Sequence, residues 1–255
     1  MSDSSTSLHN AEPVGQPFTS VPRLSVEGMS VTYRGGAVGC SEVSFAVSPG
    51  SVLAVLGRNG VGKTSLLRGI AGFQSTEGVD VRGAVSLDGA PLPKNPVSVN
   101  RAGVAFVPER EKIFPSLTVA EHLKITGVTE LADIEPLRFP ALQDRWSARA
   151  GLLSGGERQM LALAMTWAQR PSVLLVDELS LGLAPIVVKQ LLRSIREIVE
   201  GYGVSAVVVE QDAVAALSVA DQVVILDHGE VVWSGDRSET NAAEVGARYL
   251  GLGAE

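Results

Sequence analysis

The segment of residues 51–65 reads SVLAVLGRNGVGKTS. Its first part, residues 51–56, is a continuous apolar run typical of a strand that is buried on both faces. Glycines follow, and then Lys63 and Thr64 complete the spacing G-x-x-x-x-G-K-[ST]. A helix is expected to begin near Lys63 and to end by Gly72. A strand, a glycine-rich loop and a helix in this order predict a phosphate-binding loop, although an ordinary strand-to-helix turn would also fit.

The loop offers groups suited to nucleotide phosphates. Glycines let the backbone N–H groups wrap the phosphates, and the helix N-terminus adds a favourable dipole. Lys63 would reach the terminal phosphates, and the Thr64 hydroxyl is a ligand for Mg²⁺. The residues expected to bind the nucleotide here are Gly57, Arg58, Asn59, Gly60, Gly62, Lys63, Thr64 and Ser65.

Two carboxylates end a second apolar run, SVLLVDE. Parallel sheets bind ligands at the carboxyl ends of their strands. Asp177 is therefore expected to hold Mg²⁺, directly or through water, and Glu178 to orient and deprotonate the attacking water. Without the phosphate loop, the same pair would fit a helix N-terminal cap equally well.

A Ser-Gly-Gly-Glu segment precedes another predicted helix. Ser154 and Glu157 have the spacing of a capping box, and Gly155 and Gly156 permit the turn. The uncharged start of this helix is also an anion receptor, because its N–H groups point outward. Both interpretations remain open from the residues alone.

Composition limits the class of protein. The 255 residues are 45% hydrophobic and 19% charged, which fits one substantial globular core. The net charge is −7 and the basic residues are scattered, so no nucleic-acid partner is expected. Cys40 is the only cysteine, which excludes an intramolecular disulfide. The aliphatic runs fall short of the roughly 20 residues that span a bilayer.

Periodicity indicates the remaining elements. Near alternation over residues 24–33 and 43–47 predicts antiparallel strands at the start of the chain. Further strands are expected at 84–87, 103–107, 172–176, 204–209 and 223–226, and helices at 155–169, 185–200 and 241–250.

Two segments differ from this α/β pattern. Residues 1–21 are rich in Ser, Thr, Pro and Gly and predict a disordered tail. Between residues 114 and 153 the strand signal disappears, and Thr118 and Glu121 have capping-box spacing. We interpret this second segment as a helical lobe inserted into the core.

The motifs together resemble an ABC-type ATPase. The resemblance rests on the phosphate loop, on LLSGGERQM (152–160) as the signature motif, and on VLLVDELSLGLAP (173–185). Within that class, VPEREKIFPSLTV (107–119), SLGLAP (180–185) and VEQD (209–212) are most similar to the ATP-binding subunits of branched-chain amino-acid importers. The similarity runs over about residues 22–251.

The resemblance implies a fold, a cofactor set and partners. The expected fold is a phosphate-loop NTPase core of ABC type over residues 22–255, with an N-terminal antiparallel β-subdomain and the inserted helical lobe at about 114–153. ATP and Mg²⁺ would lie between this chain's phosphate loop and the signature of a second ATPase subunit, identical or related. Integral membrane permease subunits, and indirectly a solute-binding protein, would complete the importer. The ATPase would then be cytoplasmic and peripheral on the inner face of the cell membrane.

The resemblance also assigns individual residues. Tyr33 lies where the family stacks an aromatic ring on adenine, although a strand residue packing on its neighbours is the alternative. Glu109 lies where a Gln usually contacts Mg²⁺, so the implied metal residues are Thr64, Glu109 and Asp177. Gln211 lies where a His usually contacts the γ-phosphate, which makes it a catalytic candidate with Glu178; a helix cap is the alternative.

The expected function is an ATP-hydrolysing subunit that powers an importer of branched-chain or other amino acids, or of small amides. Two alternatives stay open. One is a nucleotide-binding regulatory subunit with weak catalysis, which the unusual Glu109 and Gln211 favour and Glu178 opposes. The other is a soluble ABC ATPase without a transport role.

Overall fold

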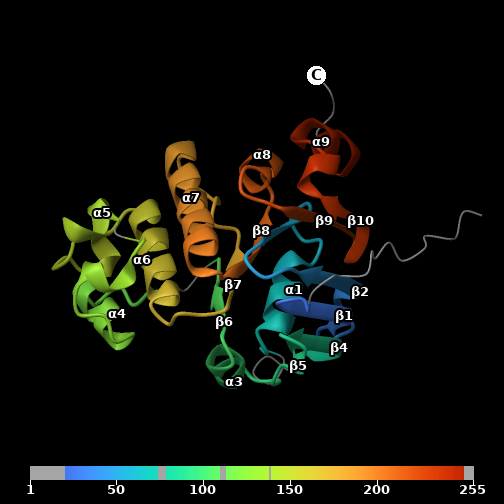
Figure 1. The fold of residues 1–255 in the computed structure, drawn as a ribbon, viewed down its shortest axis with the longest axis horizontal. Helices are drawn as coiled ribbons and strands as arrows, with labels where there is room; N and C mark the ends of the chain where they lie inside the picture. The colour runs from blue at the N-terminus through green and yellow to red at the C-terminus, as the bar shows by residue number, and fades with distance from the viewer. Residues whose placement is uncertain (1–20, 74–78, 110–112, 138, 250–255) are drawn as a thin grey trace, which may run out of the picture.

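The computed structural model describes residues 21–73, 79–109, 113–137 and 139–249 (Figure 1), and the statements below refer to these residues. The predicted disordered tail, residues 1–21, lies outside them except for Val21.

The central sheet has six strands in the order β10-β9-β3-β8-β7-β6, of which β10 is antiparallel to β9 and the others are parallel. Every residue of β3, β7 and β8 is buried, as expected for parallel strands covered on both faces. The strands are β3 (Val52–Leu56), β6 (Val104–Val107), β7 (Val173–Asp177), β8 (Ser205–Glu210), β9 (Gln222–Asp227) and β10 (Glu230–Asp236).

A second, antiparallel sheet has the order β2-β1-β4-β5. Its strands are β1 (Leu24–Thr32), β2 (Val38–Val47), β4 (Asp80–Leu87) and β5 (Ala90–Pro91). The apolar alternation of β1 skips one residue between Val26 and Met29, and the pairing register shifts there. Gly28 has a φ of 56°, so this is a β-bulge that keeps both flanking side chains in the core.

The helices segregate in space. In Figure 1, α4, α5 and α6 lie at one end of the molecule, and the antiparallel sheet with α1 lies at the other. The long helices are α1 (Lys63–Ile70), α6 (Gly155–Trp167), α7 (Pro185–Tyr202) and α9 (Ala242–Tyr249). The shorter ones are α3 (Pro96–Arg101), α4 (Val119–Ile125), η1 (Leu131–Ile134), α5 (Pro140–Gln143), η2 (Ala150–Leu152), α8 (Ala213–Leu217) and η3 (Arg237–Glu239).

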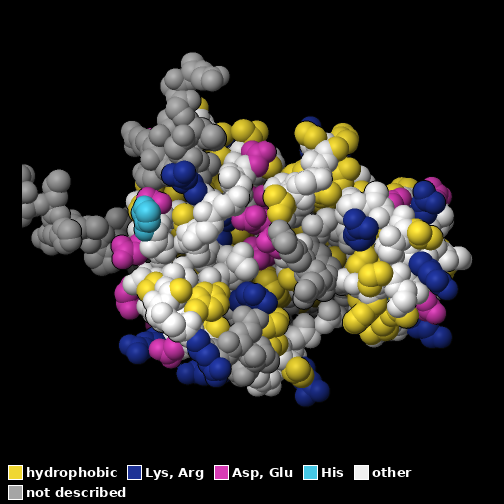
Figure 2. Space-filling view, turned by 180° about the vertical axis from the view of Figure 1, so that it is seen from behind, with side chains coloured by type: hydrophobic (Ala, Val, Ile, Leu, Met, Phe, Trp, Pro, Cys, Tyr) yellow, Lys and Arg dark blue, Asp and Glu magenta, His cyan; other side chains and the backbone are white. Residues whose placement is uncertain are grey.

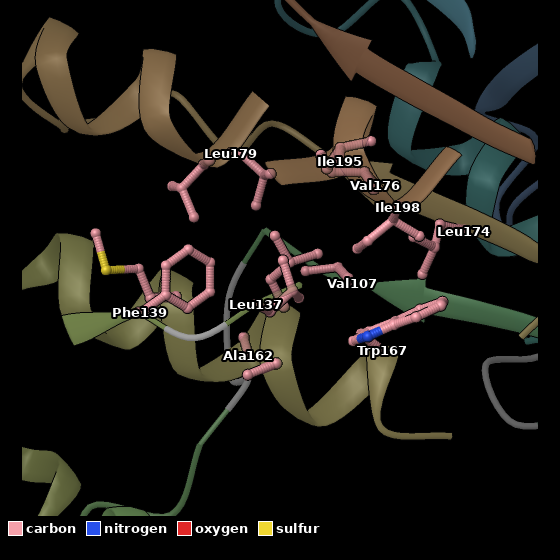
Figure 3. Close-up of a cluster of buried hydrophobic side chains, with 14 of the residues drawn as sticks. Val107, Leu137, Phe139, Ala162, Trp167, Leu174, Val176, Leu179, Ile195 and Ile198 are labelled. Atoms are coloured by element: carbon pink, nitrogen blue, oxygen red, sulfur yellow. The ribbon is translucent and has the colours of Figure 1, made fainter. Parts of the chain in front are cut away.

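One buried apolar cluster joins the helical end to the sheet. Trp167 of α6 faces Leu174 of β7 and Ile198 of α7 in this cluster (Figure 3). The Trp167 indole N–H donates to the Glu135 carbonyl oxygen at 2.8 Å, so its one polar atom is satisfied. Because this packing is continuous from α6 to β7, the helical end is held against the strand that carries Asp177.

The observed layers confirm the expected α/β class, with an antiparallel sheet beside a mainly parallel one. The sequence did not indicate β5, α3 or α8, which are short elements flanked by Pro, Asn or Asp. The boundaries assigned to the helical lobe, 114–153, stay a prediction. Within the described ranges, no helix combines the length and the apolar character that crossing a bilayer requires.

Candidate functional site

The glycine-rich loop turns tightly between β3 and α1. Gly62 precedes the helix with a φ of 103°, and Gly60 has a φ of 81°, which are backbone conformations that favour glycine. A Cβ atom at Gly62 would overlap with the carbonyl oxygen of Gly39 in β2. The loop is therefore pressed against the antiparallel sheet, and its shape depends on the missing side chain.

Lys63, the first residue of α1, has a side chain that is only 3% exposed. Its ammonium donates to the carbonyl oxygens of Gly57 at 2.8 Å and Arg58 at 3.0 Å. It also forms an ion pair with Glu178 Oε1 at 3.0 Å. A buried charge needs such partners, and a phosphate oxygen approaching this ammonium would compete with Glu178 for it.

Asp177 lies at the end of β7, next to the phosphate loop. The Thr64 hydroxyl donates to Asp177 Oδ1 at 3.1 Å. Asp177 Oδ2 is buried and has no hydrogen-bond partner among the described residues. Burial, with the nearby carboxylates of Glu178 and Glu109, raises the pKa of Asp177 to about 6 against the Thr64 hydrogen bond and Lys63, which lower it.

These groups suit a small divalent cation. The described residues contain no group of three or more His, Cys, Asp or Glu side chains that could hold a metal alone. Mg²⁺ is usually held by one or two carboxylates together with substrate phosphates. The unpartnered Asp177 oxygen beside the Thr64 hydroxyl and the phosphate loop fits that pattern. More generally, acidic side chains gather along the middle of one face of the molecule (Figure 2).

Glu178 leaves the sheet in an unusual conformation. Its φ is 41°, in the left-handed region, and its N–H donates to the Val209 carbonyl oxygen at 3.0 Å. A left-handed backbone in a non-glycine residue costs free energy and is often found at functional sites. The turn aims the Glu178 carboxylate back at Lys63 instead of continuing along β7.

The three polar residues that end β8 have three different environments. Glu210 is fully buried and accepts the Ser180 N–H at 3.1 Å and the Ser180 hydroxyl. Asp212 caps α8, accepting the N–H groups of Val214 at 2.9 Å and Ala215 at 3.1 Å. Gln211 is exposed, and of the three side chains it is the one that neither bonds to Ser180 nor caps α8. Glu210 and Asp212 thus have structural partners, and the helix cap considered for Gln211 is made by Asp212 instead.

The Ser154–Glu157 segment begins α6 as a capping box. The Glu157 N–H donates to Ser154 Oγ at 3.2 Å, and the Ser154 N–H donates to Glu157 Oε2 at 2.7 Å. Despite partial burial, these bonds and Arg145 hold the pKa of Glu157 below its usual value. A Cβ on Gly156 would lie 2.8 Å from Val187 Cγ1, and one on Gly155 would lie 3.2 Å from Leu183. Glycines thus let α6 approach the segment that leads into α7.

The structure does not bring this segment to the phosphate loop of the same chain. In Figure 1, α6 and α1 lie on opposite sides of β7 and β8. Ser154 is exposed at the start of α6. Its hydroxyl is therefore available to a second molecule.

Tyr33 and Glu109 lie at the two borders of the site. The Tyr33 ring is half-buried against the core of the antiparallel sheet, and its hydroxyl is 2.8 Å from Ser65 Oγ in α1. Glu109 follows β6 and lies near enough to Asp177 to raise the pKa of that carboxyl. Residues 110–112, in the predicted VPEREKIFPSLTV motif, lie outside the described residues.

Sequence reasoning did not identify two partners, Ser180 and Gly39. Ser180 lies two residues after Glu178 and bonds to Glu210, while Gly39 supports the phosphate loop from β2. The sequence held one signal for a partner such as Ser180. Glu210 ends an apolar run, and a buried carboxylate at that place requires a hydrogen-bond donor.

Comparisons with known proteins agree with this geometry. The family model of the ABC transporter matches residues 40–180. The chain is 36% identical over 217 residues to the high-affinity branched-chain amino acid transport ATP-binding protein BraG of Pseudomonas aeruginosa, covering 82% of this chain and 91% of that relative. It is 32% identical over 208 residues to the probable branched-chain amino acid transport ATP-binding protein LivF of Archaeoglobus fulgidus, covering 78% and 86%.

Solved structures are similar in fold. An ATP-binding subunit of an ABC transporter superposes with a TM-score of 0.71 at 27% identity, covering 91% of this chain and 95% of the other. A nucleotide-free ATP-binding cassette from an ABC transporter gives a TM-score of 0.73 at 20% identity, covering 84% and 91%. The chain therefore belongs to the ABC transporter family, as an ATP-binding subunit with ATPase activity coupled to transport.

Proposed function

We propose that this chain hydrolyses MgATP at the interface with a second ATPase subunit and drives import of branched-chain or other amino acids through membrane permease subunits. The observation that carries the proposal is the convergence of Lys63, Thr64, Asp177 and Glu178 at one edge of the parallel sheet. The names of BraG and LivF support the class of solute.

Each residue has a role in the proposed reaction. The loop amides and the Lys63 ammonium bind the β- and γ-phosphates, and the ammonium exchanges its bond to Glu178 for a phosphate oxygen. The released Glu178 carboxylate then accepts the proton of the attacking water. Thr64 and Asp177, with Glu109 nearby, would hold Mg²⁺, which would supply neutralisation of charge on the phosphates. Gln211 donates a hydrogen bond to the γ-phosphate or the water, and Tyr33 packs on adenine.

In this chain the signature segment does not reach the phosphate loop. We infer that the signature segment of the second subunit completes this chain's nucleotide site, and the reverse. Ser154, with Gly155, Gly156 and Glu157, would contact the nucleotide bound by that partner through N–H groups and the serine hydroxyl. The exposed apolar side chains of Leu181 and Ile186 extend the same surface, since Leu183 lies beside Gly155. We expect the partner to be a related ATPase, because Glu109 and Gln211 differ from the family's usual residues.

The helical end of the molecule offers a docking surface for the permease. Phe114, Ile125 and Leu152 are large apolar side chains that are 62%, 63% and 80% exposed. Contact of this surface with permease subunits would hold the chain on the cytoplasmic face of the cell membrane, with the solute-binding protein on the other side. No role for nucleic acid is proposed.

Lys63→Ala is expected to abolish tight ATP binding, because it removes the buried cation that meets the phosphates. Titration with a fluorescent ATP analogue would measure the affinity, and Lys94→Ala, at an exposed lysine after β5, is the matched control. Unchanged affinity in the Lys63 variant would contradict the phosphate-loop assignment.

Glu178→Gln should bind ATP at least as tightly as the native chain, since the neutral amide competes less well for Lys63. It should nearly stop turnover, because an amide cannot accept the proton from water. ATPase rates, together with uptake of labelled leucine by cells carrying the variant, would measure both steps. Hydrolysis at the native rate would show that Glu178 is not the base.

Gln211→Ala is expected to lower the ATPase rate about tenfold or more, as for loss of one donor to the transition state. ATP affinity and melting temperature should stay unchanged, since Gln211 does not cap α8. Asp212→Ala is the matched control: losing the cap should cost about 1 kcal/mol of stability with little effect on rate. The reverse pattern would assign Gln211 to the scaffold.

Ser154→Ala and Thr118→Ala each remove the hydroxyl of a capping box, from α6 and from α4. Both should cost about 1 kcal/mol of stability. Only Ser154→Ala should also slow hydrolysis, in the complex of this chain with the second ATPase, because only that hydroxyl reaches a nucleotide. A chain that pairs with itself and hydrolyses ATP at the full rate of that complex would contradict the related-partner proposal.

A further inference from the structure

Glu210 lies at the end of the central strand of the site. In the sheet it pairs with Leu56, the last residue before the phosphate loop. On the other side, Val209 pairs with Asp177 and accepts the N–H of Glu178. Glu210 is thus between the loop that binds phosphate and the turn that carries Glu178, and its side chain is fully buried.

The Glu210 carboxylate collects hydrogen bonds from two separate loops. Oε1 accepts the Ser180 N–H at 3.1 Å, and Oε2 accepts the Ser180 hydroxyl. The carboxylate also accepts the N–H of Gln211. Because Ser180 follows Glu178 by two residues, one side chain connects the turn that aims Glu178 with the backbone that presents Gln211.

Stability alone does not account for a carboxylate at this position. Burial raises the pKa of Glu210 to about 7 against the hydrogen bonds from Ser180, and the nearby Glu178 carboxylate raises it further. A carboxyl whose pKa is higher in the folded than in the unfolded chain loses stabilisation as the pH rises through about 7. At pH 8 the buried charge therefore carries a free-energy cost that a neutral residue of the same shape would not carry.

We propose that Glu210 is a positioning residue. By bonding to Ser180 and to the Gln211 N–H, it fixes the turn that carries the catalytic Glu178 relative to Gln211. This inference rests on the roles proposed for Glu178 and Gln211 and adds a residue that touches neither substrate nor metal. The left-handed Glu178 needs such support, since its backbone conformation persists only where the surroundings hold it. A displacement of about 1 Å at a catalytic group can lower a rate 100-fold.

The test compares Glu210→Gln, Ser180→Ala and their double variant in the full-length chain, with the second ATPase subunit present if activity requires it. Glu197→Gln, at a surface ion pair with Arg193, is the matched control. A Gln keeps the shape and one acceptor oxygen but cannot accept from all the donors that the carboxylate serves. The measurements are kcat, KM for ATP, melting temperature at pH 8, and amide hydrogen exchange at Ser180 and Gln211.

Glu210→Gln should lower kcat about tenfold or more, with KM for ATP unchanged and the melting temperature not lowered. Exchange at Ser180 and Gln211 should accelerate in this variant and not in the control. Ser180→Ala should change kcat in the same direction, and the double variant should be no slower than Glu210→Gln alone, because both substitutions break one connection.

Three results would overturn the proposal: native kcat in Glu210→Gln, unchanged amide exchange at both positions, or a kcat loss that comes with a lower melting temperature and weaker ATP binding. The last result would mean that Glu210 only supports the fold.

The Glu178→Gln variant distinguishes a failure of this proposal from a failure of the proposed function. If Glu178→Gln kept native turnover, the proposed base would be wrong; if it lost turnover while Glu210→Gln kept it, only the connection would be wrong.

Discussion

The parallel pairing of β3, β8 and β7 is the constraint on which the site depends. The backbone ladder sets Leu56 opposite Glu210 and Asp177 opposite Val209, so the three strands end within one residue of one another. Neighbouring strands lie about 4.8 Å apart, and the loops that leave β3 and β7 therefore start about 10 Å from each other. This distance lets the Lys63 ammonium reach both the loop carbonyls and the Glu178 carboxylate, although the two residues are far apart in the sequence.

Several carboxylates lie close together at this edge of the sheet, and their mutual repulsion has a functional consequence. Burial, with the carboxylates of Glu178 and Glu109, raises the pKa of Asp177 to about 6, and burial with Glu178 raises the pKa of Glu210 to about 7. Raised carboxyl pKa values at neutral pH mean that the folded chain holds negative charge at a free-energy cost. Active sites commonly trade stability for function in this way. A cation that enters with nucleotide phosphates would relieve the repulsion between the carboxylates and complete the site.

Local patterns predicted much of the fold and of the site, and contacts between distant segments account for the rest. The phosphate loop, the strand ending in Asp177 and Glu178, and the start of α6 each depend on a few consecutive residues, so their spacing was readable. The partners of the VEQD residues were not. Glu210 accepts a hydrogen bond from Ser180, which follows the neighbouring strand β7, whereas Asp212 caps α8 through residues close to it in sequence. The sequence pattern does not distinguish these two roles. The bulge at Gly28 was not predicted either, because near alternation over residues 24–33 does not show where the pairing register shifts.

The antiparallel sheet then has a mechanical part in nucleotide binding. The Gly39 carbonyl of β2 lies against Gly62, and the Tyr33 hydroxyl is bonded to Ser65, so β2 and the residue after β1 both contact the start of α1. The parallel sheet fixes the loop from one side and the antiparallel sheet fixes it from the other. A loop held on both sides presents its N–H groups in a fixed arrangement, and preorganised donors lose less entropy when an anion binds. For this reason the N-terminal sheet contributes to the binding site together with the loop itself.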